Sequence, residues 1–121
     1  MKVPVKLRYR LWFERDGEYV LGGGVAALLQ SIYELGSLKK AAEKLGIPYR
    51  GAWGRIHKAE EALGLPLVES SNDRQKGVSL TPEALRLLKA FHILDELCRD
   101  DLLARVEEQK FDELEISAVE H

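Results

Sequence analysis

Six basic side chains fall within the stretch from Ser37 to Lys58, which holds one acidic residue, Glu43. They are Lys39, Lys40, Lys44, Arg50, Arg55 and Lys58, in a chain whose formal net charge is −2. Lysine and arginine donate charge-assisted hydrogen bonds to phosphate, so this group of residues is suited to binding a polyanion. A localised basic surface on an otherwise acidic protein is typical of a nucleic-acid contact.

The same stretch has the pattern of two helices joined by a tight turn. Ser37 suits an N-cap, Gly46 a left-handed C-cap, and Pro48 the first position of a second helix. Apolar residues recur at helical spacing on both sides of the turn, at Ala41, Ala42, Leu45, Ala52, Ile56, Ala59 and Leu63. Residues 37–63 are therefore predicted to form a helix-turn-helix, whose second helix fits the major groove of DNA.

The face of the second helix opposite its apolar stripe carries the side chains that we expect to contact DNA. Arg50 is expected near base edges and Arg55 nearer the phosphate backbone. Gly51 and Gly54 would allow a close approach to the duplex, although chance drift explains two glycines equally well. The expected DNA contacts are Ser37, Lys39, Pro48, Tyr49, Arg50, Gly51, Gly54, Arg55, His57, Lys58, Arg74 and Lys76. The alternative is that these charges only solvate an exposed helix. Trp53, on the same helix, is expected in the core.

Elements on both sides of this stretch complete a winged helix-turn-helix, a fold that is mostly α with small β. Residues 1–24 alternate apolar and polar around an Asp16-Gly17 turn, which predicts a β-hairpin. Residues 25–64 are predicted to be helical, and residues 65–80 to form a two-stranded wing. Arg74 and Lys76 lie near the tip of that wing, for which a solvated loop is the alternative.

A long helix is predicted over residues 81–109, with Thr81 as its cap. At about 1.5 Å per residue it would be roughly 42 Å long, against a radius of gyration of about 14 Å for a globule of this size. Its surplus apolar surface predicts a homodimer. The expected dimer interface is Leu87, Phe91, Leu94, Cys98 and Leu102. Residues 110–121 are expected to be an acidic tail.

Length and composition restrict the remaining possibilities. A chain of 121 residues predicts one domain, and Cys98 as the only cysteine indicates the reducing cytoplasm and no disulfide within the chain. No apolar run has membrane-spanning length. An enzyme would have to use His92, Asp95 and Cys98 on the last helix, where a cysteine in an apolar stripe is more often packing. We expect no catalytic, metal or cofactor site, and the glycines at 22–24 lack the Lys-Ser/Thr of a P-loop.

The chain resembles the N-terminal DNA-binding domain of ModE-type, molybdate-responsive transcriptional regulators. The matching segments are LGGG, GSLKKAAEKLGIPYRGAW, LGLPLVE and SLTPEALRLL, which together extend over about Leu7 to Leu88. Tyr49, Ala52 and Trp53 form the most specific part, while the looser pattern is shared with LysR-type winged helices. The resemblance implies a winged helix, a dimer, and a recognition helix that carries Tyr49 and Arg50.

Three departures from that family limit what is carried over. Gly54 stands where the family often has aspartate, and SSNDRQKG replaces a glycine-rich wing. The sequence ends without an oxyanion-binding domain, so no molybdate response and no small-molecule effector are expected from this chain alone. The predicted function is a sequence-specific DNA-binding transcriptional regulator that acts as a homodimer. The alternative is a winged-helix protein-interaction module that does not bind DNA specifically.

Overall fold

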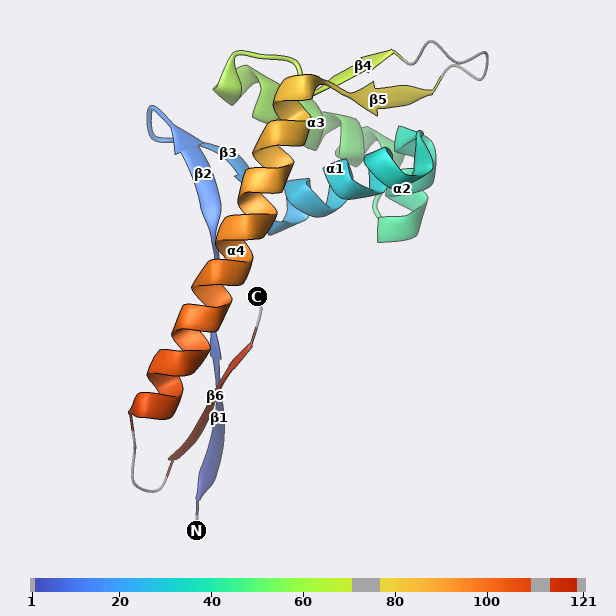
Figure 1. Cartoon of the computed structure of the whole chain (residues 1–121). Helices are drawn as coiled ribbons and strands as arrows, with labels where there is room; N and C mark the ends of the chain where they lie inside the picture. The colour runs from blue at the N-terminus through green and yellow to red at the C-terminus, as the bar shows by residue number, and fades with distance from the viewer. Residues whose placement is uncertain (1, 71–76, 110–113, 120–121) are drawn as a thin grey trace. The chain divides into compact units, whose positions relative to one another are not determined.

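A computed structural model describes residues 2–70, 77–109 and 114–119 of the chain. The chain divides into two compact units, residues 12–91 and a terminal unit made of residues 1–11 and 92–121. The 12–91 unit holds β2 (Trp12–Arg15), β3 (Glu18–Gly22), α1 (Gly23–Leu35), α2 (Leu38–Leu45), α3 (Tyr49–Leu63), β4 (Val68–Ser70) and β5 (Val78–Leu80). The terminal unit holds β1 (Val3–Arg8) and β6 (Leu114–Val119), and α4 (Pro82–Glu108) has residues in both units (Figure 1).

The core of the 12–91 unit is built from the inward faces of its helices. α1 contributes Leu28, Leu29 and Ile32, and α3 contributes Ile56, all no more than 1% exposed. α2 and α3 pack their small alanines toward this core, at Ala41, Ala42, Ala52 and Ala59. Small side chains let two helices cross closely, so the helix-turn-helix predicted over 37–63 is confirmed.

The turn between α2 and α3 uses the predicted residues. The Ser37 hydroxyl accepts a hydrogen bond from the Lys40 amide at 3.2 Å, which caps α2. Gly46 ends α2 with a φ of 67°, and the Ile47 amide donates to the Ala42 carbonyl at 3.0 Å. Pro48 is the extended N-cap of α3 and not its first helical residue, because its ψ is 145°.

The wing begins and ends on the strands that were predicted for it. β4 and β5 pair antiparallel, with Val68 opposite Leu80 and Ser70 opposite Val78. The Val78 amide donates to the Gly36 carbonyl at 3.3 Å, which ties β5 to the turn before α2. Thr81 caps α4 by accepting from the Ala84 amide at 3.2 Å. Arg74 and Lys76 lie outside the described residues.

The hairpin predicted over residues 1–24 is correct only in its second half. β2 and β3 pair antiparallel around Asp16-Gly17, where both φ values are positive. β1 instead pairs in parallel with β6, with Val3 opposite Leu114 and Arg8 opposite Val119. Alternation of apolar and polar residues reveals a strand but not its partner, so the sequence pattern could not distinguish the two pairings. The segment expected to be only an acidic tail therefore contains a strand.

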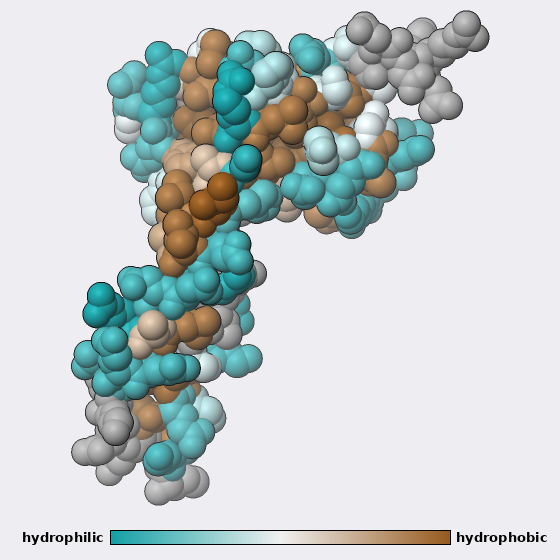
Figure 2. Space-filling model, viewed as in Figure 1, coloured by the Kyte–Doolittle hydropathy of each residue, from teal (hydrophilic) through white to brown (hydrophobic). Residues whose placement is uncertain are grey.

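The two units differ in how much apolar surface they bury. Every buried apolar side chain among the described residues lies between Val20 and Phe91. In the terminal unit the apolar side chains of Val3, Leu94 and Leu97 are 50%, 43% and 59% exposed. Figure 2 shows hydrophobic surface along the middle of α4. No helix of the described residues is long and apolar enough to cross a membrane.

One part-buried hydrogen bond joins two segments of the terminal unit. The Tyr9 hydroxyl donates to the Asp95 carboxylate at 3.0 Å, which joins the chain after β1 to α4. Desolvation, followed by this hydrogen bond and the carboxylate charge, raises the pKa of Tyr9 to about 12.

Candidate nucleic-acid interface

The candidate interface is the outer face of α3, which the core fixes in place. Ala52, Ile56 and Ala59 are at most 2% exposed and hold one side of the helix against the 12–91 unit. The opposite side is exposed and carries Arg50, Gly51, Gly54, His57 and Lys58. α3 therefore presents two cations and two residues without side chains on one accessible surface.

The C-terminal end of α3 is tied to a neighbouring segment. Gly64 ends the helix with a φ of 79°. The Arg15 guanidinium, from the β2–β3 hairpin, donates to the Leu63 carbonyl. Because the last carbonyls of a helix lack intrahelical donors, this contact stabilises the end of α3. Arg15 is a positioning residue that sequence reasoning missed, since hairpin and helix end are 48 positions apart.

The two glycines of the outer face have no packing reason within the described structure. A methyl group added at Gly54 would meet nothing within 4 Å, and one added at Gly51 would touch only the Pro48 ring at 3.9 Å. Each glycine costs a helix interior roughly 1 kcal/mol relative to alanine. No neighbouring group requires either glycine, so the close approach of an external ligand stays a prediction, with chance drift as its alternative.

We predict that Gly51→Leu will weaken binding to duplex DNA without weakening the fold. The leucine gains helix propensity, so the free energy of unfolding should stay equal or rise by up to about 1 kcal/mol. Its side chain would hold the duplex away, and a loss of about 1–3 kcal/mol in binding is expected, the value of one good base contact. Fluorescence anisotropy with a labelled duplex measures the binding, and Gly51→Ala is the smaller matched change. Full affinity in Gly51→Leu would exclude a close approach at this position.

Three ring side chains form a row along α3. The rings of Tyr49 and Trp53 meet edge to face with centroids 6.4 Å apart. The imidazole of His57 stacks on Trp53, with centroids 4.9 Å apart and planes 13° apart. Trp53 is half-buried, so its placement in the core is correct only in part. The row orients the His57 ring at the edge of the exposed face.

Glu60 connects this row to the wing. One of its carboxylate oxygens lies 3.2 Å from His57 Nδ1. The other accepts from the amides of Leu67 at 2.8 Å and Val68 at 3.4 Å. Sequence reasoning missed Glu60, and the available signal was a carboxylate one turn before the end of a helix that enters a tight loop.

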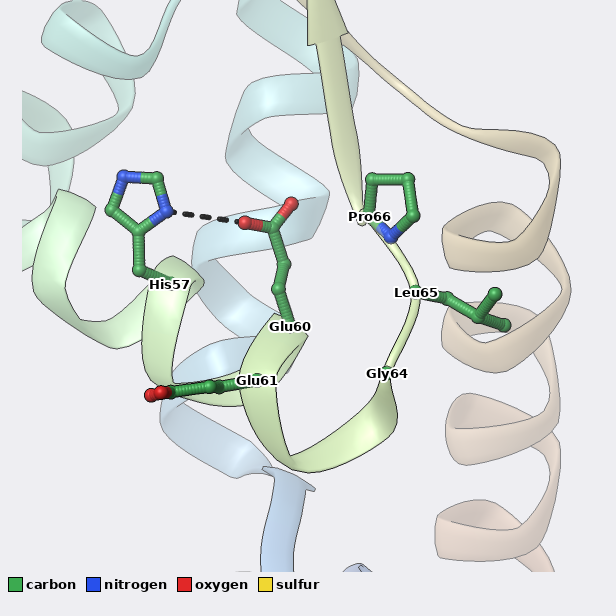
Figure 3. A pocket seen from close by; sticks show the side chains of 6 residues that line it. All are labelled: His57, Glu60, Glu61, Gly64, Leu65 and Pro66. Atoms are coloured by element: carbon green, nitrogen blue, oxygen red, sulfur yellow. Dashed lines mark hydrogen bonds and ion pairs between the residues drawn. The ribbon is translucent and has the colours of Figure 1, made fainter.

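A shallow depression lies beside Glu60 and is shown in Figure 3. It is lined by His57, Glu60, Glu61, Gly64, Leu65 and Pro66. Its two carboxylates repel anions, so the depression is unsuited to phosphate. The exposed face of α3 that carries Arg50, His57 and Lys58 therefore remains the candidate DNA-binding surface.

The polar residues at the start and end of α2, and Arg55 of α3, differ in their surroundings. Lys39 is exposed, whereas the Ser37 hydroxyl already serves as the α2 cap. Lys44 pairs with Glu34 at 2.9 Å. A hydrogen bond from Gln30, followed by the contacts of Lys44, lowers the pKa of Glu34. Arg55 is exposed, and its guanidinium lies 3.9 Å from the position of a methyl group built on Gly24 of α1.

One of the five predicted dimer residues is in the core. Phe91 is 2% exposed and meets Phe13 edge to face at 6.0 Å. The prediction for Phe91 was therefore wrong. The periodicity of a long helix shows which residues share an apolar stripe, but not which of them pack in the core of the same chain. Leu87 and Leu102 are half-buried, and Leu94 and Cys98 are exposed. Ile93 and Leu97 are also exposed, and the predicted interface did not include them.

Residues 26–85 match a family model described as the bacterial regulatory helix-turn-helix protein, lysR family. Two curated relatives are 30% identical. One is the molybdenum-pterin-binding protein MopB of Rhodobacter capsulatus, aligned over 68% of this chain and 31% of its own. The other is the transcriptional regulator ModE of Haemophilus influenzae, aligned over 76% of this chain and 33% of its own. The chain thus spans about a third of the length of these curated relatives.

Solved structures of DNA-binding domains have a similar fold. The BenM DNA-binding domain in complex with benA site 1 DNA is 25% identical, with a TM-score of 0.55 over 70% of this chain and 94% of that one. The CbnR DNA-binding domain, also in a DNA complex, is 22% identical, with a TM-score of 0.56 over 71% of this chain and 97% of that one. The 12–91 unit therefore has the winged-helix fold of these DNA-binding domains.

Proposed function

Residues 26–85 match the model of the lysR family of bacterial regulatory helix-turn-helix proteins, and on this premise we propose that the chain is a sequence-specific DNA-binding transcriptional regulator that acts as a homodimer. The observation that carries the proposal is the exposed outer face of α3. Arg50 and Lys58 lie there beside Gly51 and Gly54, on a helix whose other side is fixed by the core.

The composition of this face fits the major groove of DNA. An α-helix enters that groove, and arginine reads guanine there by two parallel hydrogen bonds. Arg50 lies in the first turn of α3, the part of a recognition helix that contacts base edges. We assign Arg50 to base edges, and Arg55, Lys58 and Lys39 to phosphates. Pro48, Tyr49 and Ser37 are proposed to flank the groove, and Arg74 and Lys76 to reach the backbone from the wing.

The apolar surface of the terminal unit supports the homodimer. No apolar side chain of the described residues 2–11, 92–109 and 114–117 is buried. A pair of strands and half a helix without a buried core are marginal in water. A second copy that packs on Leu94, Cys98 and Leu102, together with Ile93 and Leu97, would remove much of this surface from solvent. Two recognition helices could then read half-sites about 34 Å apart.

Further parts of the proposal concern what acts with this chain. We propose that the protein works in the cytoplasm and that this chain alone responds to no small-molecule effector. The relative from Haemophilus influenzae is called a transcriptional regulator, and this description agrees with the proposed role.

Selection of bound sequences from a random duplex pool tests the proposal. Enrichment of a repeated motif, with binding that weakens as salt rises, is the expected result, since each phosphate contact adds about 0.9 to the slope of log K against log[salt]. A protein-interaction module would enrich no motif and would show no such slope. That outcome would refute DNA recognition and favour the alternative.

A further inference from the structure

One carboxylate on α3 serves two structural elements at once. Through one oxygen Glu60 contacts the His57 ring, and through the other it accepts from two amides at the start of the wing. The Glu60 side chain is only 18% exposed, whereas that of His57 is 65% exposed. The carboxylate is thus held in place by the fold, and the imidazole that it contacts is accessible to a partner.

The contacts of His57 determine which ring nitrogen is available. A carboxylate can only accept, so Nδ1 carries the proton that faces Glu60. The parallel Trp53 ring restricts rotation of the imidazole. The second ring nitrogen, Nε2, lies on the side of the ring away from Glu60 (Figure 3). The fold therefore presents Nε2 in a fixed direction.

We propose that Glu60 is a positioning residue that holds His57 as a phosphate contact of the recognition helix, formed by the protonated imidazole. This inference rests on the proposed DNA-binding function. A neutral ring with its proton on Nδ1 offers only an acceptor at Nε2, which cannot bind a phosphate oxygen. Protonation places an N–H donor and a positive charge at Nε2, which can bind a phosphate oxygen. DNA binding should then gain one phosphate contact at low pH.

Besides Glu60, two charged residues of the described chain lie beside His57 on α3. Glu61 lines the same depression, and Lys58 is its neighbour on α3. The remaining lining residues, Gly64, Leu65 and Pro66, bring no ionisable group. Imidazole is the ordinary side chain that changes charge between about pH 5 and pH 8, whereas carboxylates and lysine keep theirs.

The salt dependence of DNA binding at two pH values tests the proposal. The full chain and a labelled mixed-sequence duplex are titrated at about pH 5.5 and pH 8, either side of imidazole titration. The slope of log K against log[salt] should be steeper at the lower pH by about 0.9, the value of one phosphate contact. His57→Gln should show equal slopes at both pH values, close to that of the wild type at high pH. His92→Gln, a histidine of the terminal unit, should keep the difference.

The outcomes separate this inference from the function on which it rests. Salt-dependent binding with the same slope at both pH values would overturn the His57 contact and leave DNA binding intact. A pH difference that disappears in His92→Gln would overturn it as well. Absence of duplex binding at either pH would refute the proposed function and this inference together.

Glu60→Gln separates positioning of His57 from support of the wing. The amide oxygen of glutamine can still accept from Leu67 and Val68, so an unchanged thermal midpoint is expected. The glutamine amide nitrogen would then face His57 Nδ1 as a donor, so the Nδ1–H group loses its acceptor and the ring loses its fixed direction. The slope difference between the two pH values should therefore shrink. A Glu60→Gln protein with the full difference would overturn the positioning role. The positioning role would also be overturned if the slope difference disappeared only in a variant whose thermal midpoint is lowered, such as Glu60→Ala.

Discussion

Leu94→Asp is expected to convert the proposed homodimer into a folded monomer that has lost specific DNA binding. Leu94 is 43% exposed in the single chain, so an aspartate there meets water and leaves the 12–91 unit intact. In a dimer seam the same carboxylate would be buried without a partner, which costs several kcal/mol. Sedimentation at micromolar concentration measures the association. Binding to a two-half-site duplex should fall toward that of a single recognition helix, although Arg50 is unchanged.

Two controls test whether the loss of association is specific to the interface and whether the variant is folded. Leu85→Asp lies on the same helix at 40% exposure and outside the proposed interface, so it should remain dimeric. Far-ultraviolet circular dichroism of Leu94→Asp should match the wild type. A wild-type monomer at micromolar concentration would refute the arrangement, and a Leu94→Asp dimer would remove this residue from the interface.

Of the changes proposed on the outer face of α3, Arg50→Ala should have the largest effect on sequence preference. The guanidinium is exposed in the first turn of α3, where two parallel hydrogen bonds to a guanine edge are possible. Its loss should cost about 1–3 kcal/mol on the preferred duplex and much less on a scrambled one. The ratio of the two affinities, measured by anisotropy, should therefore fall.

The matched control for Arg50 is another exposed arginine. Arg86→Ala removes the same charge from α4, where the side chain is 73% exposed, and should leave both affinities nearly unchanged. Arg55→Ala and Lys58→Ala should weaken all duplexes alike, because phosphate contacts carry no sequence information. Equal losses on both duplexes in Arg50→Ala would reassign Arg50 to the backbone.

The sequence predicts the central part of the fold because its signals there are local. A cap at Ser37, a left-handed glycine at Gly46 and alanines at helical spacing are all read within a few residues, and each is present as predicted. Thr81 and the Asp16-Gly17 turn are of the same kind. Signals of this type depend on backbone geometry that neighbouring residues impose.

Pairings between distant segments could not be predicted in this way. β1 pairs with β6 across more than a hundred positions, and the residue types of β1 do not indicate which strand will pair with it. Burial of Phe91 depends on Phe13, which lies in another strand. Of the candidate site, the outer face of α3 follows from periodicity, whereas the contacts of Glu60 with Leu67 and of Arg15 with Leu63 require the folded chain.

The described residues of the terminal unit include no buried apolar side chain, which has a consequence for how such proteins diverge. Substitutions at the exposed positions of α4 beyond Phe91, such as Leu94 and Leu97, meet water in the single chain, so they disturb no close packing of side chains. After a gene duplication, the two products could therefore acquire different pairing preferences through a few changes near Leu94 and Leu97. Their recognition helices would meanwhile remain the same, and mixed pairs would be avoided without any change in the DNA sequence that each copy reads.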